Sequence, residues 1–444
     1  MNAPRLVLRN LRRRPLATFL TGASVALGVA LFAAVGALRQ ASEEGFQRTA
    51  GLCDTLVGAK GSTLELTLNA LYHMGQSPGN VPYPLYQELR ETPGVQWSVP
   101  LAVGDSFRGY RIVGVTDELF SKVALRQAGA EAARVGLAFS EGGPFTYTDE
   151  EFAHLKEDLA FEEAEGHEGG HHHHDHGHEE LYKVVLGADV ARATGLGVGD
   201  SIVATHGVEG SVDFHEEAPA AIVGVLEGTG TPLDRAVYIP IGAYYVMEGH
   251  EPLEGMEEGG ARDPRGLSGI MLGTKAGFYR MGLYRAINDR LDAQAVFPSV
   301  EVRKLFELVG TADQVLRWVS LMVVVVALLG VMVAIYNTMG ARRREFAILR
   351  ALGARRRTLL GLVMAESALL ALLGGIAGLG LSGILVMVAG DQVKEVTGVA
   401  VAALPGLPEL LLLGAVTLAG ALAGLVPAIS AYRTETAHAL AAQT

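Results

Sequence analysis

Four long runs without a charged side chain limit what this chain can fold into. They cover residues 15–38, 318–341, 367–390 and 410–432. A helix needs roughly 20 apolar residues to cross the hydrocarbon core of a membrane. The runs therefore predict four transmembrane helices, one near the start of the chain and three near its end.

The composition indicates that membrane helices are only part of the protein. The chain is 49% hydrophobic and 19% charged, which is too apolar for an average soluble protein and too charged for membrane helices alone. We therefore expect an α+β integral membrane protein with four transmembrane helices, arranged 1 + 3, and a large soluble domain between the first two. The single Cys53 excludes an intramolecular disulfide.

The positions of the arginines predict which side of the membrane each segment lies on. They gather before the first run, between the second and third runs, and after the fourth: Arg5, Arg9, Arg12, Arg13, Arg14, then Arg342, Arg343, Arg344, Arg350, Arg355, Arg356, Arg357, then Arg433. Because basic loops stay in the cytosol, both termini are expected there and residues 41–311 outside. The net charge of −12 then lies mainly outside, where it favours cations over nucleic acid as partners.

These boundaries predict a domain organisation. The segments are a cytosolic N-terminus with transmembrane helix 1 (1–40), an external domain (41–311) with a His-rich loop (166–180), transmembrane helix 2 (312–341), a cytosolic coupling helix (342–358), transmembrane helix 3 (359–390), a short external loop (391–409), transmembrane helix 4 (410–432) and a cytosolic tail (433–444).

The external domain has the signals of a mixed fold. We expect strands at 109–115, 183–187, 220–226 and 235–240, and helices at 84–92 and 277–291. The pattern lacks the regular alternation of a nucleotide-binding sheet, and no Walker A sequence is present. The Gly-rich segment 194–200 precedes a strand and is typical of a turn.

The basic loop between the second and third runs predicts an amphipathic helix. Its apolar side chains follow Glu345 at helical spacing, arginines flank them, and Gly353 ends or bends the helix. Such a helix can lie on an anionic lipid surface or dock on a protein partner. The single acid and the compact apolar face favour the partner.

The same region resembles a known family. The sequence REFAILRALGARRRTLLGLVMAESALLALLGGIAGLGLS (344–382) resembles the signature of FtsX/MacB-type (type VII) ABC transporter permeases, and LAGLVPAISAYRTETAHAL (422–440) resembles their closing segment. The segment 223–240 resembles part of the family's periplasmic domain. The segment 56–74 is similar to a subgroup that we associate with zinc-uptake loci.

The resemblance implies a function and partners. The protein would be a non-enzymatic permease subunit in the bacterial inner membrane, with residues 41–311 forming a MacB-like periplasmic domain. It would pair with a separate cytosolic ABC ATPase, form a dimer with itself or a sibling permease, and meet a periplasmic binding or adaptor protein. The ATPase contact would be made by Arg344, Glu345, Ile348, Leu349, Arg350, Leu352 and Gly353.

Glycines spaced for close helix packing lie in the last two runs. They are Gly374, Gly375, Gly378, Gly420 and Gly424. Small residues four apart let helices approach closely in a membrane. This spacing fits packing within one subunit or a seam between two subunits.

The His-rich loop is the unusual part of the external domain. Its candidate metal ligands are His167, His171, His172, His173, His174, His176 and His178. Imidazoles bind zinc, copper and nickel, but this spacing is redundant and unlike a closed structural zinc site. We expect exchangeable zinc binding and no intrinsic cofactor. A solvated insert without a role, a pH-responsive element and a purification tag are the alternatives.

Three functions remain open on the sequence alone. The first is transport or export at the cell envelope driven by the partner ATPase, with zinc handling as its specific form. The second is an FtsX-like relay that regulates an envelope hydrolase and moves no substrate. The third, a signalling permease for envelope stress, fits less well because such permeases usually have ten spans.

The orientation gives a testable prediction. Reporter fusions should place residue 170 outside the membrane and residue 350 inside, because the basic segments flank the cytosolic ends of the spans. Periplasm-active and cytosol-active reporters fused at both positions measure this. The opposite pattern at either position contradicts the orientation.

Overall fold

The computed structural model describes residues 15–126, 134–155, 178–203, 219–246, 265–351, 355–399 and 406–433. The chain divides into two compact units. Unit 1 comprises Met1–Ser42, Val309–Gln392 and Val401–Thr444, and unit 2 comprises Glu43–Leu308 and Val393–Ala400.

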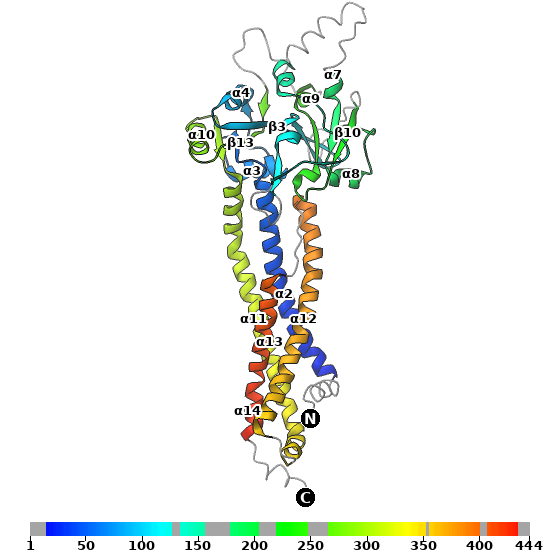
Figure 1. Cartoon of the computed structure of the whole chain (residues 1–444), viewed down its shortest axis with the longest axis vertical. Helices are drawn as coiled ribbons and strands as arrows, with labels where there is room; N and C mark the ends of the chain where they lie inside the picture. Colours follow the sequence, from blue (N-terminus) through cyan, green and yellow to red (C-terminus); the bar gives the residue numbers. More distant parts are fainter. Residues whose placement is uncertain are drawn as a thin grey trace, which may run out of the picture. The chain divides into compact units, whose positions relative to one another are not determined.

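Unit 1 is helical. Its helices belong to α2 (Pro15–Ala50), α11 (Pro298–Ala351), α12 (Arg356–Thr397), α13 (Leu407–Ala423) and α14 (Leu425–Arg433) (Figure 1). Within the residues that the structure describes, four stretches are long and apolar enough to cross a membrane: Thr18–Ala50, Pro298–Asn337, Arg357–Thr397 and Leu407–Ile429. One lies near the N-terminus and three follow the large domain, so the expected fold class is confirmed.

The core of unit 1 is small, and its outer surface is apolar. Val25 and Val29 of α2 are buried together with Val331 of α11 and Ala371 of α12. Large apolar side chains such as Phe19 and Val326 are exposed instead. Exposed apolar side chains on helices are expected where lipid, not water, surrounds them.

The glycines of unit 1 pack inside this chain. A methyl group on Gly378 would lie 2.6 Å from the carbonyl oxygen of Ala26, so only glycine lets α12 approach α2 this closely. Gly374 faces Gly22 and Val25 in the same way. The remaining predicted glycines face other side chains of unit 1: Gly375 faces Leu413, Gly420 faces Ala371 and Gly424 faces Ser367. The reading of these glycines as packing within one subunit is confirmed.

Unit 2 is a mixed α and β domain. Its first elements are β1 (Thr55–Ala59), α3 (Thr63–Tyr72), β2 (Val81–Pro82), α4 (Tyr83–Glu91), β3 (Val95–Phe107), β4 (Tyr110–Val115), α5 (Glu118–Lys122), β5 (Ala124–Arg126), β6 (Arg134–Gly136) and β7 (Phe139–Gly142). Then follow α7 (His178–Leu181), β8 (Lys183–Leu186), α8 (Ala188–Thr194), β9 (Ser201–Ile202), β10 (Ala220–Leu226), the 3-10 helix η1 (Pro232–Arg235), β11 (Ala236–Pro240), α9 (Ile241–Val246), β12 (Gly266–Leu267), β13 (Gly269–Thr274), α10 (Phe278–Asn288) and β14 (Ala293–Val296).

A ten-stranded sheet organises unit 2. The strand order is β14-β1-β13-β3-β4-β11-β8-β10-β7, with β9 paired to β10. The β10–β8 and β11–β4 pairs are parallel, whereas the β1–β13, β13–β3 and β3–β4 pairs are antiparallel. Figure 1 shows α10 and β13 at one end of this domain and α8 and β10 at the other. Two short pairs, β12–β2 and β5–β6, complete the described strands.

The long strand β3 divides the sheet into two parts. Its residues 95–101 pair with β13, and its residues 102–107 pair with β4. We call β14, β1, β13 and residues 95–101 of β3 the β1 lobe. We call residues 102–107 of β3, β4, β11, β8, β10 and β7 the β8 lobe. One continuous core of buried side chains lies beneath both lobes.

The secondary structure matches the sequence patterns in most places. The four strands expected from β-branched runs correspond to β4, β8, β10 and β11, and the two expected helices correspond to α4 and α10. The segment 194–200 forms a turn in which Gly195 is left-handed, at φ 71°. The helix α12 differs, because it continues to Thr397 although the apolar run ends at residue 390. Polar residues interrupt the apolar pattern there without interrupting the helix.

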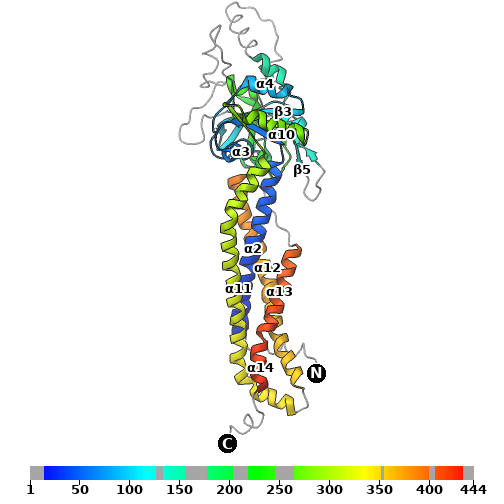
Figure 2. The ribbon, with the colours of Figure 1, turned by 90° about the vertical axis from the view of Figure 1, so that its left-hand side faces the viewer.

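The long helices are shared by the two units. α2 leaves unit 1 after Ser42, α11 leaves unit 2 after Leu308, and α12 leaves unit 1 after Gln392. Each remains a single helix across that boundary, and Figure 2 shows α2 and α11 as long continuous ribbons.

Candidate functional site

The ends of α2 and α11 meet in an aromatic contact within unit 2. The ring of Phe46 on α2 stacks on Tyr72 at 4.9 Å and meets Phe306 of α11 edge to face at 5.6 Å. The Tyr72 hydroxyl donates to the carbonyl oxygen of Phe46 at 2.6 Å. Aromatic pairs in these geometries stabilise by about 0.5–1.5 kcal/mol beyond their buried area. The two helices are therefore fixed to each other and to α3.

The link from α2 to β1 is also fixed. Asp54 accepts a hydrogen bond from the backbone N–H of Thr274 at 3.1 Å and pairs with Arg280 of α10 at 3.3 Å. The preceding Cys53 is buried, and burial raises the pKa of its thiol well above its usual range. The thiol therefore stays protonated and unreactive at physiological pH.

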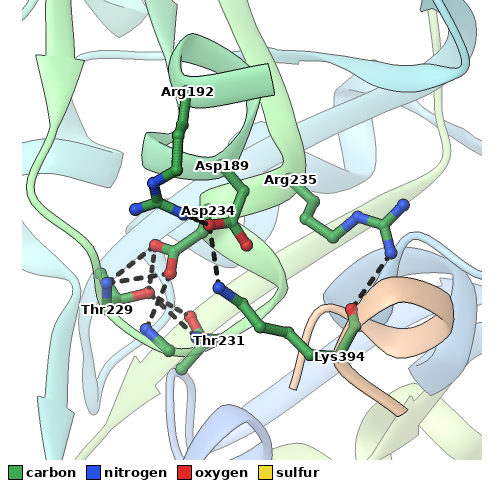
Figure 3. Close-up of polar contacts among 8 residues, drawn as sticks. Asp189, Arg192, Thr229, Thr231, Asp234, Arg235 and Lys394 are labelled. Atoms are coloured by element: carbon green, nitrogen blue, oxygen red, sulfur yellow. Dashed lines mark hydrogen bonds and ion pairs between the residues drawn. The ribbon is translucent and has the colours of Figure 1, made fainter. Parts of the chain in front are cut away.

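The end of α12 and the residues that follow it, Val393–Ala400, also belong to unit 2, and we call this segment the α12 tip. The Lys394 ammonium lies 3.0 Å from a carboxylate oxygen of Asp189, and that same oxygen accepts from Arg192 one turn along α8 (Figure 3). Asp189 lies in the first turn of α8, where the helix dipole favours a negative charge. The α12 tip is thus tied to the start of α8.

An arginine caps the end of α12. Arg235 donates from its guanidinium to the carbonyl oxygen of Lys394 at 3.2 Å (Figure 3). Carbonyl groups in the last turn of a helix accept hydrogen bonds from outside the helix, and a cation there also complements the helix dipole. The Arg235 guanidinium lies over the Tyr110 ring at 5.8 Å, which helps hold it in place.

The chain turns sharply after α12. Gly398 has a φ of 71° and donates to the carbonyl oxygen of Lys394 at 2.9 Å, as a glycine does after a helix end. A methyl group there would lie 2.8 Å from the Cα of Pro232, so both the backbone conformation and the space require glycine. The next residue, Val399, is fully buried in the core of unit 2. The tip is therefore inserted into the domain and is more than a surface contact.

The loop that receives the tip is shaped by Asp234. Its carboxylate accepts from the backbone N–H groups of Thr229 and Gly230, each at 2.8 Å, and from the Thr229 hydroxyl at 2.7 Å (Figure 3). Burial raises the pKa of Asp234, while these hydrogen bonds act in the opposite direction. The carboxylate holds residues 229–234 in one conformation and so positions Pro232 and Arg235 against α12.

The residues expected to bind an ATPase are only partly described. Arg344, Glu345, Ile348, Leu349 and Arg350 lie on the last turns of α11, whose backbone is helical to Ala351. Their side chains, and Leu352 and Gly353 altogether, lie outside the described residues. Their role in binding stays a prediction.

The expected metal ligands also fall largely outside the described part of the chain. His178 begins α7, whereas His167, His171, His172, His173, His174 and His176 lie outside the described residues. Among the residues that the structure does describe, no group of three or more His, Cys, Asp or Glu side chains could hold a metal ion.

The functional residues expected from the sequence do not include Asp189, Asp234, Arg235, Lys394 or Gly398. The segment 223–240 carries the family resemblance and overlaps two expected strands, and residues between those strands form the receiving loop. A glycine that follows a polar extension of an apolar run was the available signal for the end of α12.

Comparison with known proteins gives matches over both parts of the chain. Residues 318–436 match the FtsX-like permease C-terminal family, and residues 18–277 match the MacB-like periplasmic core domain family. The periplasmic region of MacB from Actinobacillus actinomycetemcomitans is 12% identical, with 57% of this chain and 92% of that chain covered at a TM-score of 0.31. No curated protein matches the sequence.

These matches define a class of protein, a multi-pass membrane protein with a periplasmic domain that is a non-catalytic subunit and pairs with an ABC ATPase. The MacB-like match alone covers more than half of the 444 residues. The chain belongs to the MacB-like periplasmic core domain family and is an ABC transporter permease of the FtsX/MacB type.

The role of Asp234 gives a testable prediction. Asp234→Asn should destabilise the full chain by about 1–3 kcal/mol, because an amide N–H₂ would face backbone N–H donors in a buried site. Thermal unfolding of the purified protein in lipid nanodiscs measures the loss. Asp200→Asn is the matched control, since this exposed carboxylate accepts one backbone N–H, from Gly197. Equal stability of the two variants contradicts the assignment.

Proposed function

We propose that this permease transmits motion from a separate cytosolic ABC ATPase to its periplasmic domain, for transport or export at the cell envelope. The ATPase would dock on residues 342–358, with Glu345, Ile348 and Leu349 at the centre of the contact. In this scheme ATP binding closes the ATPase pair, and the helices carry the displacement to unit 2 as a two-state change biased by a distant ligand.

One observation carries the proposal. α11 is a single helix from Pro298, directly after β14, to Ala351 within the predicted docking segment. A hydrogen-bonded helix is stiff along its axis, so a displacement at one end is passed to the other instead of being absorbed in a loop. A continuous rod from the docking segment to the sheet is what such a relay needs.

The partners and the orientation belong to the same proposal. Both termini would be cytosolic in a bacterial inner membrane, with residues 41–311 in the periplasm. The permease would work as a dimer with itself or a sibling and meet a periplasmic adaptor or binding protein. The alternative is an FtsX-like relay that regulates an envelope hydrolase, and the two differ in whether a substrate leaves the membrane.

The docking segment gives a mutational prediction. Glu345→Ala combined with Leu349→Ala should remove about 2 kcal/mol or more of binding free energy, because central interface side chains contribute most to association. This equals roughly thirtyfold weaker association with the ATPase that co-purifies with the chain. ATPase stimulation in nanodiscs, titrated with the permease, measures the shift.

A matched control uses the exposed face of α10. Arg285→Ala combined with Phe278→Ala also removes one charged and one apolar exposed side chain, but in unit 2. This variant should leave stimulation at the wild-type level. If the Glu345 and Leu349 variant stimulates as well as wild type, the docking assignment fails.

We further propose that the His-rich loop captures zinc exchangeably and that the transport is zinc-related. The support is chemical: seven imidazoles within twelve residues, flanked by carboxylates, can supply alternative sets of three or four nitrogen ligands. Binding should weaken at low pH, where imidazole is protonated.

Replacement of the seven histidines tests the metal proposal. Changing all seven between His167 and His178 to Gln in the full chain should remove most zinc binding, measured by calorimetry in detergent. The control replaces histidines outside the tract, namely His154, His206, His215 and His250. Equal zinc stoichiometry in wild type and the tract variant overturns the proposal.

A further inference from the structure

The helices α2, α11 and α12 connect to the sheet of unit 2 at two separate places. α2 leads through residues 51–54 into β1, and α11 follows β14 directly, so both join the β1 lobe through paired strands. The α12 tip instead contacts α8, which follows β8, and η1, which precedes β11. Since β8 and β11 are paired, the α12 tip is attached to the β8 lobe.

The two lobes are joined through a single strand in the sheet. β3 hydrogen-bonds to the β1 lobe only through residues 95–101 and to the β8 lobe only through residues 102–107. Its register with β4 also shifts between Val103 and Ser106. A strand whose two halves pair with different neighbours and that carries an irregularity is where a sheet bends most readily.

The α12 attachment has several independent parts. Lys394 and Asp189 form an ion pair, Arg235 caps the helix end, Gly398 makes the turn that fits against Pro232, and Val399 is buried in the core. The ion pair is partly exposed, so it contributes less to stability than to geometry. The tip is therefore held by charge, by a hydrogen bond, by close packing and by burial.

We propose that the α12 tip is a second point at which force enters the periplasmic domain, acting on the β8 lobe while α2 and α11 act on the β1 lobe. Lys394, Asp189 and Arg235 are positioning residues for this transfer. A displacement of α12 relative to α2 and α11 then changes the angle between the lobes at β3. The inference rests on the proposed function, because it requires that the ATPase moves the helices.

Distance measurements with spin labels test the inference on the full chain with its co-purified ATPase in nanodiscs. The native Cys53 is buried and leaves introduced cysteines as the sites that react. The first label pair, Leu291→Cys and Val198→Cys, reports on the two lobes, and both positions are exposed. The second pair, Phe19→Cys and Ile384→Cys, reports on the position of α12 relative to α2 within unit 1, and both positions are exposed.

In wild type, both label distances should change when ATP or a non-hydrolysable ATP analogue is added, compared with the nucleotide-free state. Lys394→Glu should abolish the nucleotide-dependent change between Leu291 and Val198 and leave the change between Phe19 and Ile384 intact. Lys394→Arg should restore it, because it keeps the cation next to Asp189. A purely structural role for Lys394 would not separate the two label pairs in this way.

Two further variants serve as a second test of the α12 tip and as a control. Gly398→Ala alters the α12 tip without changing its charge, because alanine disfavours the positive φ and its methyl group would contact Pro232. This variant should also abolish the distance change between Leu291 and Val198. Arg192→Ala removes the other cation on Asp189 without touching α12 and should leave both signals unchanged. Unchanged thermal unfolding shows that the variants are folded.

The outcomes separate the inference from the proposed function. If Lys394→Glu keeps the distance change between Leu291 and Val198, or if wild type shows a change only between Phe19 and Ile384, the α12 inference is overturned and the relay function stands. If ATP changes neither distance in wild type, the relay function fails and the inference fails with it.

Discussion

Backbone hydrogen bonding inside a membrane is the constraint on which this structure depends. Hydrocarbon offers no partner to N–H and C=O groups, so a spanning segment must be a helix that satisfies them internally. In this permease the helices do not end where their apolar runs end. α2, α11 and α12 each contribute residues to both compact units without a break, so the hydrogen-bond ladder that lipid requires continues beyond the apolar run of each helix.

Packing within unit 1 follows from a second consequence of lipid. Because apolar side chains gain little from leaving hydrocarbon for another helix, close backbone approach must supply the attraction. Gly374 and Gly378 permit this against α2, and Gly420 and Gly424 permit it between α13 and α12. The helix α12, which ends in the α12 tip, is thereby packed against α2, the helix that leads to β1.

Much of this architecture could be predicted from local sequence, and the reasons are specific. The four apolar runs predict the spans because hydrophobic length is a local property. The run 220–226 coincides with β10 because its preference for a strand is also a local property. The continuation of α12 to Thr397 differs from the prediction because residues 391–397 are mostly polar, and hydropathy alone does not show where a helix stops.

The site at the α12 tip depends on long-range contacts that no local pattern contains. Lys394 and Asp189 are far apart in sequence and come together where the end of α12 meets the start of α8. Asp234 is unremarkable in the sequence until its buried donors at Thr229 and Gly230 are seen. By contrast, the docking side chains around Glu345 and the histidine tract remain predictions, since their side chains lie outside the described residues.

The helical nature of α12 also limits how this gene can change. One part of the helix must present Gly378 to Ala26, and a later part must present Lys394 to Asp189. Each inserted or deleted residue rotates everything beyond it by about 100° and shifts it by about 1.5 Å. A single-codon insertion between Gly374 and Gly378, or between Lys394 and Gly398, would therefore put one contact of that pair out of phase.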